Sequence, residues 1–556
     1  MTQISNVFEE RAEYLSREEL HEWTATTRED QAILNKLTGP GAKLLSGPRG
    51  SGKSTFLRRA YFRLLETRAA LPVYVNYAKS LALEPLFHHR ANALLVFRQW
   101  VLLKIAVSSF ETLETFNVPI SEELVKFATF GKSFISDLET GAQPEKIDML
   151  LSPSVLIELI EAASEAIGAR RSVLLLDDAA HAFSAEQQRE FFEVFRQLRT
   201  RLISPKAAVY PGVTSYSPYF HIGHEAEVVE AWYRPEDHGY LSLMHDLVAK
   251  RLPKGLSVIL LERPDMLDLL AFAAFGIPRG FLNMIAQVLR VDEGEPRAPS
   301  RQSTLAAITD NADSAERVFT SLSGKLPRFR YYIEIGEELL RSATGAVQEY
   351  NAGRDISTKA VIVALQAPLS AELQRITQLL EYAGVMRQVD SVSRGEKGIF
   401  QRFAIHYSFL ITANALNLGR TFALADVVTA LTKRDPHAFV RRAPSSLLGT
   451  DFRDRCKLDL PPCTKCGAPR LTEDQRYCMK CGSELSRASV YRELLRSPIE
   501  ILPISRAKIE GIMEQTTLRT VQDILADDEN QLRKVPYIGP VWQARIKTYA
   551  EEYVSV

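Results

Sequence analysis

Five short apolar runs that end in polar residues recur through the first 235 positions of the chain. They cover residues 42–46, 71–77, 172–178, 207–215 and 226–231. The third is apolar from Val173 to Leu176 and ends in two aspartates, so it has no polar face. Such a run predicts a strand buried on both sides, as in a parallel sheet covered by helices. We therefore expect an α/β core, in which Pro211 interrupts the fourth strand.

Helical periodicity fills the intervals between these runs and dominates the chain beyond them. We expect helices at about 54–65, 238–251, 263–274 and 316–349, and a polar, flexible link at 292–315. A long helical stretch at about 85–168 separates the second strand from the third by more than a usual connection. It is either an insertion for a partner or a helical layer over the sheet, and both interpretations stay open.

Residues 356–410 follow the order of a winged helix. The pattern predicts a first helix at 360–365, a second helix capped by Ser370, and two strands on either side of a wing tip at 393–398. Arginine and lysine in such a tip can lie along DNA phosphates. The alternative is a winged helix used only for packing or for protein contact.

Composition and charge add limits rather than a function. The chain has 556 residues, 46% apolar and 24% charged, which suits about three or four domains with hydrophobic cores. The formal net charge is zero, so nucleic-acid binding would rest on local patches. The most apolar window, residues 91–110, is broken by Arg98 and Lys104, which favours a core helix over a membrane span. Because residues 1–5 carry no apolar signal region, we expect a soluble cytoplasmic protein with no membrane partner.

A glycine-rich loop lies between the first strand and the first long helix. It comprises Gly47, Pro48, Arg49, Gly50, Ser51, Gly52, Lys53, Ser54 and Thr55. This spacing is that of a phosphate-binding loop, in which glycines let backbone N–H groups turn inward and the helix N-terminus adds its positive dipole. Lys53 would reach the β- and γ-phosphates of a nucleotide, and Ser54 would hold Mg²⁺. The alternative is a strand-to-helix turn with no ligand.

Polar residues at the ends of later elements extend this site. Asp177 and Asp178 end the third strand at the edge where parallel sheets bind ligands, so Asp177 is expected to coordinate Mg²⁺; a capping pair is the alternative. Thr214 ends the fourth strand, where its hydroxyl would bond the γ-phosphate or the attacking water, unless it is only a solvated strand end. Pro278 opens a helix whose first turn carries Arg279, either a γ-phosphate contact or a surface arginine.

Together these features resemble the AAA+ ATPases over about residues 25–340, and most closely the branch of origin-recognition initiators, transposition ATPases and STAND signalling NTPases. The resemblance implies ATP and Mg²⁺ as ligands. It makes Lys53 and Ser54 the Walker A pair, Asp177 and Asp178 the Walker B residues, Thr214 sensor 1 and Arg279 sensor 2. Asp178 takes the place of the glutamate that orients the attacking water in many relatives. Its side chain is shorter by one methylene, which predicts slow hydrolysis.

The chain departs from the family pattern in one place. Between Thr214 and Ala226 there is little room for the helix whose end carries the arginine finger of ring-forming relatives. A homo-oligomer is therefore left open by the sequence.

All five cysteines lie between Cys456 and Cys481. Four of them form two matching Cys-x-x-Cys-Gly turns and are Cys463, Cys466, Cys478 and Cys481. Four thiolates at this spacing predict a closed tetrahedral Zn²⁺ site, which is structural rather than catalytic. Paired redox thiols are the alternative. Zinc ribbons of this kind bind nucleic acid or protein.

Residues 498–556 resemble a tandem helix-hairpin-helix domain, which implies DNA binding without base reading. The better hairpin covers residues 532–546, where Gly539 would present backbone N–H groups to a phosphate beside Lys534 and Arg545. A helical module that docks on protein is the alternative.

Six segments are expected in chain order. They are a helical segment 1–41, a P-loop ATPase core 42–235 with the insertion 85–168, a helical lid and linker 236–349, a winged helix 350–440, a Cys₄ zinc ribbon 455–490 and a helix-hairpin-helix domain 495–556. We interpret the whole as an ATP-hydrolysing AAA+ switch acting with DNA in replication, transposition, repair or anti-phage defence. The alternative is a STAND-like signalling NTPase or scaffold that binds a protein partner.

Overall fold

The computed structural model describes residues 7–8, 11–88, 92–141, 147–178, 185–291, 296–419, 421–433, 435, 437–472, 475–485 and 490–555. A five-stranded parallel sheet organises the first half of the chain, in the order β2-β3-β4-β1-β5. The strands are β1 Lys43–Ser46, β2 Leu71–Asn76, β3 Ser172–Asp177, β4 Ile203–Val209 and β5 Glu227–Glu230. The expected α/β core is confirmed. The fourth strand differs from the expectation at 207–215, because it begins earlier and ends before Pro211.

Strand β3 shows why this sheet is covered on both faces. All six of its residues are buried. Val173 and Leu175 pack with the helices on one face, whereas Leu174 and Leu176 join the larger core on the other. The first face is covered by α3 Arg28–Thr38 and α4 Lys53–Thr67, and the second by α5 Ala93–Phe116, α7 Pro153–Ala166 and α8 Ala185–Gln197. The polar residues of β3 are thus its two ends, Ser172 and Asp177, and parallel sheets bind ligands at the carboxyl end.

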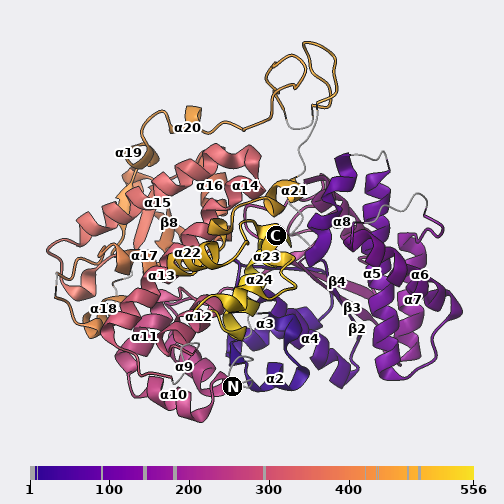
Figure 1. Cartoon of the computed structure of the whole chain (residues 1–556), viewed down its shortest axis with the longest axis horizontal. Helices are drawn as coiled ribbons and strands as arrows, with labels where there is room; N and C mark the ends of the chain where they lie inside the picture. The colour runs from indigo at the N-terminus through magenta and orange to yellow at the C-terminus, as the bar shows by residue number, and fades with distance from the viewer. Residues whose placement is uncertain are drawn as a thin grey trace.

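The long helical stretch after β2 lies on the sheet (Figure 1). Helix α5 contacts β2 and α8, and α7 contacts β3 and β4, while α6 Glu122–Glu139 packs on α5 from outside. Among the described residues α5 is the helix long and apolar enough to cross a bilayer, and 61% of its most apolar window is buried within the protein. Two of the three helices therefore form a layer over the sheet, with α6 added outside it.

A helical region follows the sheet. It contains α9 Tyr240–Arg251, α10 Lys254–Leu261, α11 Pro264–Ala273, α12 Pro278–Val288, α13 Arg301–Thr320, α14 Leu322–Lys325 and α15 Arg330–Asn351. The flexible link expected at 292–315 is wrong over most of its length, because α13 begins at Arg301 with Ser300 and Ser303 capping each other. Residues 292–295 lie outside the described residues. The polar composition hid an apolar stripe that includes the buried Ala307 and Ile308.

A second sheet, in the order β7-β8-β6-β9, occupies the expected winged-helix region. Its strands are β6 Ile362–Gln366, β7 Met386–Ser393, β8 Ile399–Ile405 and β9 Val440–Arg442. The helix expected at 360–365 is wrong: this segment is β6, which pairs with β8 on one side and β9 on the other. The spacing of apolar residues alone does not distinguish a short buried strand from a helix. Here the segment is a strand because both of its edges pair with other strands. The helices of this region are α16 Ala371–Tyr382, α17 Tyr407–Thr412, α18 Leu424–Thr432, α19 Pro444–Leu448 and α20 Phe452–Arg455.

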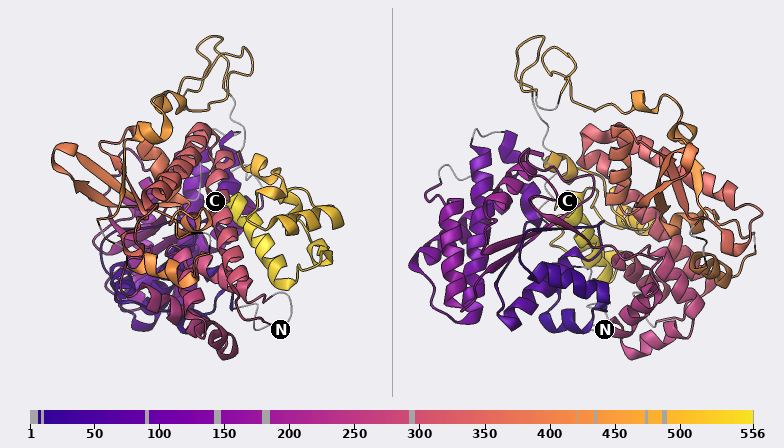
Figure 2. Two further views of the ribbon diagram at one scale, coloured as in Figure 1. Left: turned by 90° about the vertical axis from the view of Figure 1, so that its left-hand side faces the viewer. Right: turned by 180° about the vertical axis from the view of Figure 1, so that it is seen from behind.

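The last part of the chain returns to the first. Its elements are α21 Val490–Leu495, η6 Ile499–Ile501, α22 Arg506–Gln515, α23 Val521–Leu525, η7 Gln531–Lys534 and α24 Pro540–Ser555. These helices lie on one side of the body, between the parallel sheet and the helical region, whereas the preceding cysteine loop projects away from it (Figures 1 and 2). The N-terminal elements η1 Ala12–Tyr14 and α2 Arg17–Glu22 pack on α4. Segments that are distant in sequence meet there, because Arg11 lies 2.8 Å from Glu551 of α24.

Candidate nucleotide site and candidate metal centre

The glycine-rich loop turns tightly between β1 and α4. Gly52, the N-cap of α4, has φ of +94°, a left-handed conformation that favours glycine. A Cβ on Gly47 would lie 2.5 Å from the carbonyl oxygen of Ala231, so the loop passes too close to β5 for a larger residue. The N-terminus of α4 opens into a cavity of about 720 Å³, a size typical of nucleotide and cofactor sites.

Lys53 is buried at the base of this cavity and folds back on its own loop. Its Nζ donates hydrogen bonds to the carbonyl oxygens of Gly47 and Pro48, both at 2.9 Å. The ammonium also lies 3.7 Å from the centre of the Tyr210 ring. Burial, only partly offset by the nearby aspartates, lowers the pKa of Lys53 to about 7. A bound phosphate would supply the negative charge that this buried cation needs.

Asp177 stands opposite the loop at the end of β3 and is fully buried. The Tyr74 hydroxyl donates to its Oδ2 at 2.8 Å, and the Ser54 hydroxyl is a second hydrogen-bond partner. Burial, and then the charge of Asp178, raises the pKa of Asp177 to about 8. The structure thus brings together Ser54 and Asp177, the two residues that the sequence assigns to Mg²⁺. A hydroxyl and a carboxylate are oxygen donors of the kind this hard cation takes.

Asp178 lines the cavity directly. Its backbone N–H donates to Asp177 Oδ1 at 3.0 Å, and its φ is +52°. A left-handed backbone is uncommon for a residue with a Cβ and persists where the surrounding structure enforces it, often in functional sites. Residues 179–184, which follow, lie outside the described residues.

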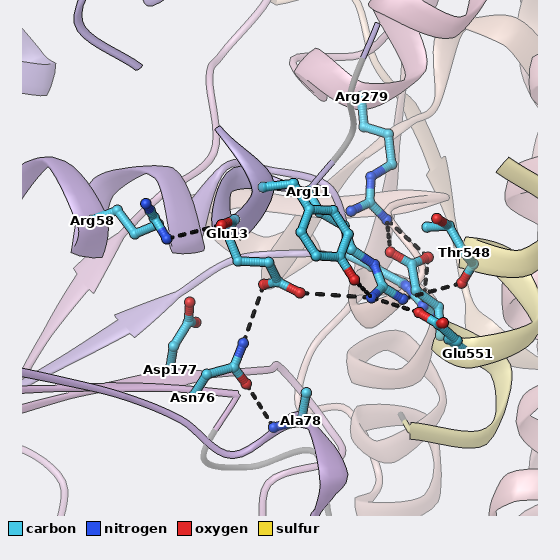
Figure 3. Close-up of polar contacts among 12 residues, drawn as sticks. Arg11, Glu13, Arg58, Asn76, Ala78, Asp177, Arg279, Thr548 and Glu551 are labelled. Atoms are coloured by element: carbon cyan, nitrogen blue, oxygen red, sulfur yellow. Dashed lines mark hydrogen bonds and ion pairs between the residues drawn. The ribbon is translucent and has the colours of Figure 1, made fainter. Parts of the chain in front are cut away.

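Glu13 joins these acids from the other end of the chain, and the sequence did not point to it (Figure 3). The Asn76 side-chain amide donates to Glu13 Oε2 at 3.1 Å, and an Arg58 guanidinium N–H donates to its backbone carbonyl at 3.2 Å. Asn76 pairs in register with Asp177, which explains how one amide brings Glu13 beside the acids. Burial, followed by the charge of Asp178, raises the pKa of Glu13 to about 6. No local motif in 11–14 signals this role.

Arg279 lines the cavity from the first turn of α12 and pairs with Glu552 of α24. The two groups lie 2.9 Å apart, and Arg49 of the glycine-rich loop lies 2.8 Å from the same carboxylate. Burial works against ionisation of Glu552, but the charges of Arg279, Arg49 and Arg11 hold its pKa at about 2. The carboxylate is therefore ionised at neutral pH.

Thr214 takes a different place from the other candidates. Its hydroxyl donates to the Tyr210 carbonyl at 2.8 Å and accepts from the Tyr210 N–H at 3.1 Å. Among the described residues that line the cavity, Tyr210 is present and Thr214 is not. The sensor role of Thr214 stays a prediction.

The four cysteines of the two Cys-x-x-Cys-Gly turns converge on one point. All their sulfur atoms lie within 4.8 Å of one another, with Cys463 3.6 Å from Cys481 and Cys466 3.5 Å from Cys478. Each turn repeats the other: Gly467 N–H donates to the first cysteine's carbonyl, as Gly482 N–H does in the second. Tetrahedral Zn²⁺ with four thiolates at about 2.3 Å needs sulfur atoms about 3.8 Å apart. The donor set and the spacing fit zinc.

Comparisons with known proteins do not establish a family for this chain. No protein-family model matches the chain, and no curated protein matches it significantly. Several solved structures are similar to the chain, and two of them cover much of its length. Cdc6p from Pyrobaculum aerophilum is 14% identical, over 74% of this chain and 97% of that one, with a TM-score of 0.32. The Orc1 protein of Aeropyrum pernix in complex with DNA is 15% identical, over 71% and 94%, with a TM-score of 0.27. Neither likeness is strong enough to establish a shared fold.

Proposed function

We propose that this protein is an AAA+-type ATPase that binds and slowly hydrolyses ATP and works as a nucleotide-dependent switch. The observation that carries the proposal is the cavity at the N-terminus of α4, which Lys53 and Ser54 line, with Asp177 buried behind Ser54 and hydrogen-bonded to it. An anion-binding loop, a buried cation and two oxygen donors are what a magnesium–triphosphate complex requires. A turn without a ligand gives no reason to place Lys53, Ser54 and Asp178 in the wall of one cavity.

The other polar residues of the site would have two roles, binding Mg²⁺ and orienting the attacking water. Ser54 and Asp177 would hold Mg²⁺, which would neutralise charge on the phosphates when bound. Asp178 and Glu13 face the same cavity, and either carboxylate can orient a water toward a phosphate in the loop. The short side chain of Asp178 is the reason to expect slow turnover. Glu13 is longer and comes from another element, so it is a second candidate for this role.

The loop is also in contact with the second sheet region, which suits a switch. The backbone N–H of Arg49 donates to the Tyr382 carbonyl at the end of α16 at 3.2 Å. The Tyr210 and Tyr382 rings lie 5.4 Å apart. A ligand that repositions Arg49 or Tyr210 would therefore also shift α16 and the β7–β8 hairpin that follows it. We propose that the nucleotide state sets how these appended regions are presented.

DNA is the partner that we propose for the appended regions. The β7–β8 hairpin projects from the body with Arg394 exposed at its tip (Figure 2). In the C-terminal helices, Lys534 is exposed and a Cβ on Gly539 would meet nothing within 4 Å, so this turn is open to a phosphate. Arg545 does not fit the expectation, because it is only 7% exposed and packs over the Trp542 ring. Its place beside a phosphate is not supported by this arrangement.

A protein partner is a second candidate, favoured by the surface of the cysteine loop. Leu471, Tyr477 and Met479 are 70%, 60% and 83% exposed around the thiols. Three large apolar side chains on a projecting loop are more typical of a protein contact than of a phosphate contact. A loop of this kind would serve the signalling NTPase or scaffold as well as the DNA switch.

ATP binding and turnover, each measured with and without duplex DNA, test the proposal. Lys53→Ala should lose ATP binding, whereas Asp178→Ala should bind ATP and lose turnover. Lys36→Ala, which removes a surface lysine paired with Glu227, is the control and should behave as wild type. Stimulation of turnover by DNA supports the DNA switch, and turnover that ignores DNA favours the protein partner. Wild-type protein that bound no ATP at millimolar concentration would contradict the assignment.

A further inference from the structure

The C-terminal helix α24 ends inside the nucleotide cavity. Its last turns contribute Glu551, Glu552 and Val554 to the cavity wall, facing the glycine-rich loop and Arg279. The helix is held there by α21 and α23 of its own region and by η2 Ala78–His88, the segment that follows β2. A part of the chain about 500 positions away from the loop thus closes one side of the site (Figure 3).

Glu552 is the residue of α24 that pairs with two arginines of the cavity wall. Its carboxylate lies between the guanidinium groups of Arg49 and Arg279, at 2.8 and 2.9 Å. The Glu552 side chain is 14% exposed, and those of Arg49 and Arg279 are 15% and 24% exposed. Carboxylates and phosphates bind the planar guanidinium fork through the same donors. One of these arginines belongs to the phosphate-binding loop itself.

We propose that Glu552 stands in the place of the terminal phosphate of a nucleoside triphosphate, so that docking of α24 and binding of the triphosphate compete for Arg49 and Arg279. The proposal rests on the ATP-binding function proposed above and adds a regulation to the same site. A diphosphate lacks the competing group and would leave the Glu552 contacts in place. A triphosphate would take over both arginines and free the C-terminal helices, residues 490–555.

The surrounding charges explain why the helix stays docked until such an anion arrives. Withdrawing Glu552 alone would remove a carboxylate partner from two partly buried guanidinium groups, which is costly. A γ-phosphate brings more charge and more acceptor oxygens than a carboxylate, so it can replace Glu552 without that cost. The exchange therefore favours the docked state with diphosphate and the released state with triphosphate.

A second contact links the same helix to the acids of the site. Arg11 lies 2.8 Å from Glu551 and donates to the Thr548 carbonyl at 3.3 Å. Two residues further on, Glu13 is held by Asn76 beside Asp177. Release of α24 would remove partners of Arg11 and loosen the segment that carries Glu13. The competition at Arg49 and Arg279 is thus coupled to the acidic side of the cavity.

Hydrogen exchange on the full-length wild-type protein tests the competition directly. AMP-PNP with Mg²⁺ should raise the exchange rate of α24 amides by at least about fivefold, whereas ADP with Mg²⁺ should leave it close to that of the free protein. Equal protection of α24 with both nucleotides, when both are bound, would overturn the proposal. This experiment needs no variant and so cannot fail through misfolding.

Affinity measurements on Glu552→Gln test the competition independently. The substitution removes the charge and keeps the shape, so AMP-PNP should bind at least about fivefold more tightly than to wild type, with ADP affinity nearly unchanged. Glu510→Gln is the matched control, because Glu510 lies in the same C-terminal region and pairs with Arg506 at the surface. An unchanged ratio of AMP-PNP to ADP affinity, with binding intact, would overturn the competition alone. Absence of binding in wild type and variant alike would overturn the ATP-binding function, and the competition with it.

Discussion

The cysteine loop and the nucleotide cavity both begin from a recognisable motif, but they are assembled in opposite ways. The loop gathers its four thiols from positions 463–481 through two turns that repeat each other. The cavity draws its wall from residues as far apart as Arg11 and Glu552. One site is complete within a short segment, while the other is complete only when both ends of the chain have folded onto the sheet.

This difference shows what a local motif determines. Closing a short loop costs little chain entropy, and the two turns can bring the thiols together without the rest of the protein. The glycine-rich loop likewise determines its own cradle, including the position of Lys53. It does not determine what stands opposite the cradle, because Glu13, Arg279 and Glu552 arrive through packing of other elements. The cavity therefore depends on distant parts of the chain, whereas the four thiols depend on the two turns that carry them.

The largest expected effect comes from disrupting the cysteine site while leaving the nucleotide cavity intact. Cys466→Ser should lower the zinc content from about one ion per chain to nearly none, because three thiolates no longer close the tetrahedron. Amides of residues 462–472 and 475–485 should lose their exchange protection. ATP affinity should stay within about twofold of wild type, since distant sites without shared partners behave additively.

Cys456→Ala is the control for this experiment, since Cys456 lies outside the four-sulfur cluster. It should retain its zinc. A Cys466→Ser protein that lost ATP binding together with zinc would show that the cysteine loop is not independent of the cavity.

The same distinction explains how much of the molecule could be predicted from the sequence. Strand β3, the glycine-rich loop and the four cysteines carry strong local patterns, and the structure has each where it was expected. The apolar pattern of segment 360–365 predicts a helix. The segment is a strand because it pairs with β8 and β9. The polar start of α13 hid a helix whose buried side is visible only against its packing partners. Glu13 and Glu552 had no signal at all, since an isolated glutamate becomes special only through the groups that surround it.

A second, intermediate effect should appear in the stability of the long-range contact as the pH changes. The pKa of Glu552 is held at about 2, below its ordinary value of 4.5. A lowered carboxyl pKa stabilises the folded state fully above the ordinary value, and that contribution is lost as the pH falls toward 2. The thermal midpoint of wild type should exceed that of Glu552→Gln by a constant amount from pH 7 to 8, above the pKa of the neighbouring Glu13, and the gap should shrink between about pH 4.5 and 3.

The charges that face Glu552 come from several elements. The pH range over which stability changes therefore depends on all of these elements and not on α24 alone. Arg11, Arg49, Arg279 and Lys325 all lie close enough to influence or be influenced by this carboxylate. Glu510→Gln should leave the midpoint nearly unchanged at every pH, because an exposed pair contributes little. A gap between wild type and Glu552→Gln that does not vary with pH would contradict the assignment of an ionised, arginine-held carboxylate.

The smallest expected effect concerns a single hydroxyl between neighbouring strands. Tyr74→Phe removes the hydrogen bond from β2 to Asp177 Oδ2 while keeping the ring in place. Losing one such bond costs about 1 kcal/mol, so the Mg²⁺ concentration for half-maximal ATP binding should rise about fivefold. Tyr61→Phe is the matched control, since its hydroxyl lies 3.5 Å from that of Thr112 and its ring packs beside Tyr74, and its Mg²⁺ requirement should not change. An unchanged requirement in Tyr74→Phe would mean that Asp177 needs no help from the adjacent strand, and that even this side of the cavity is set by the motif alone.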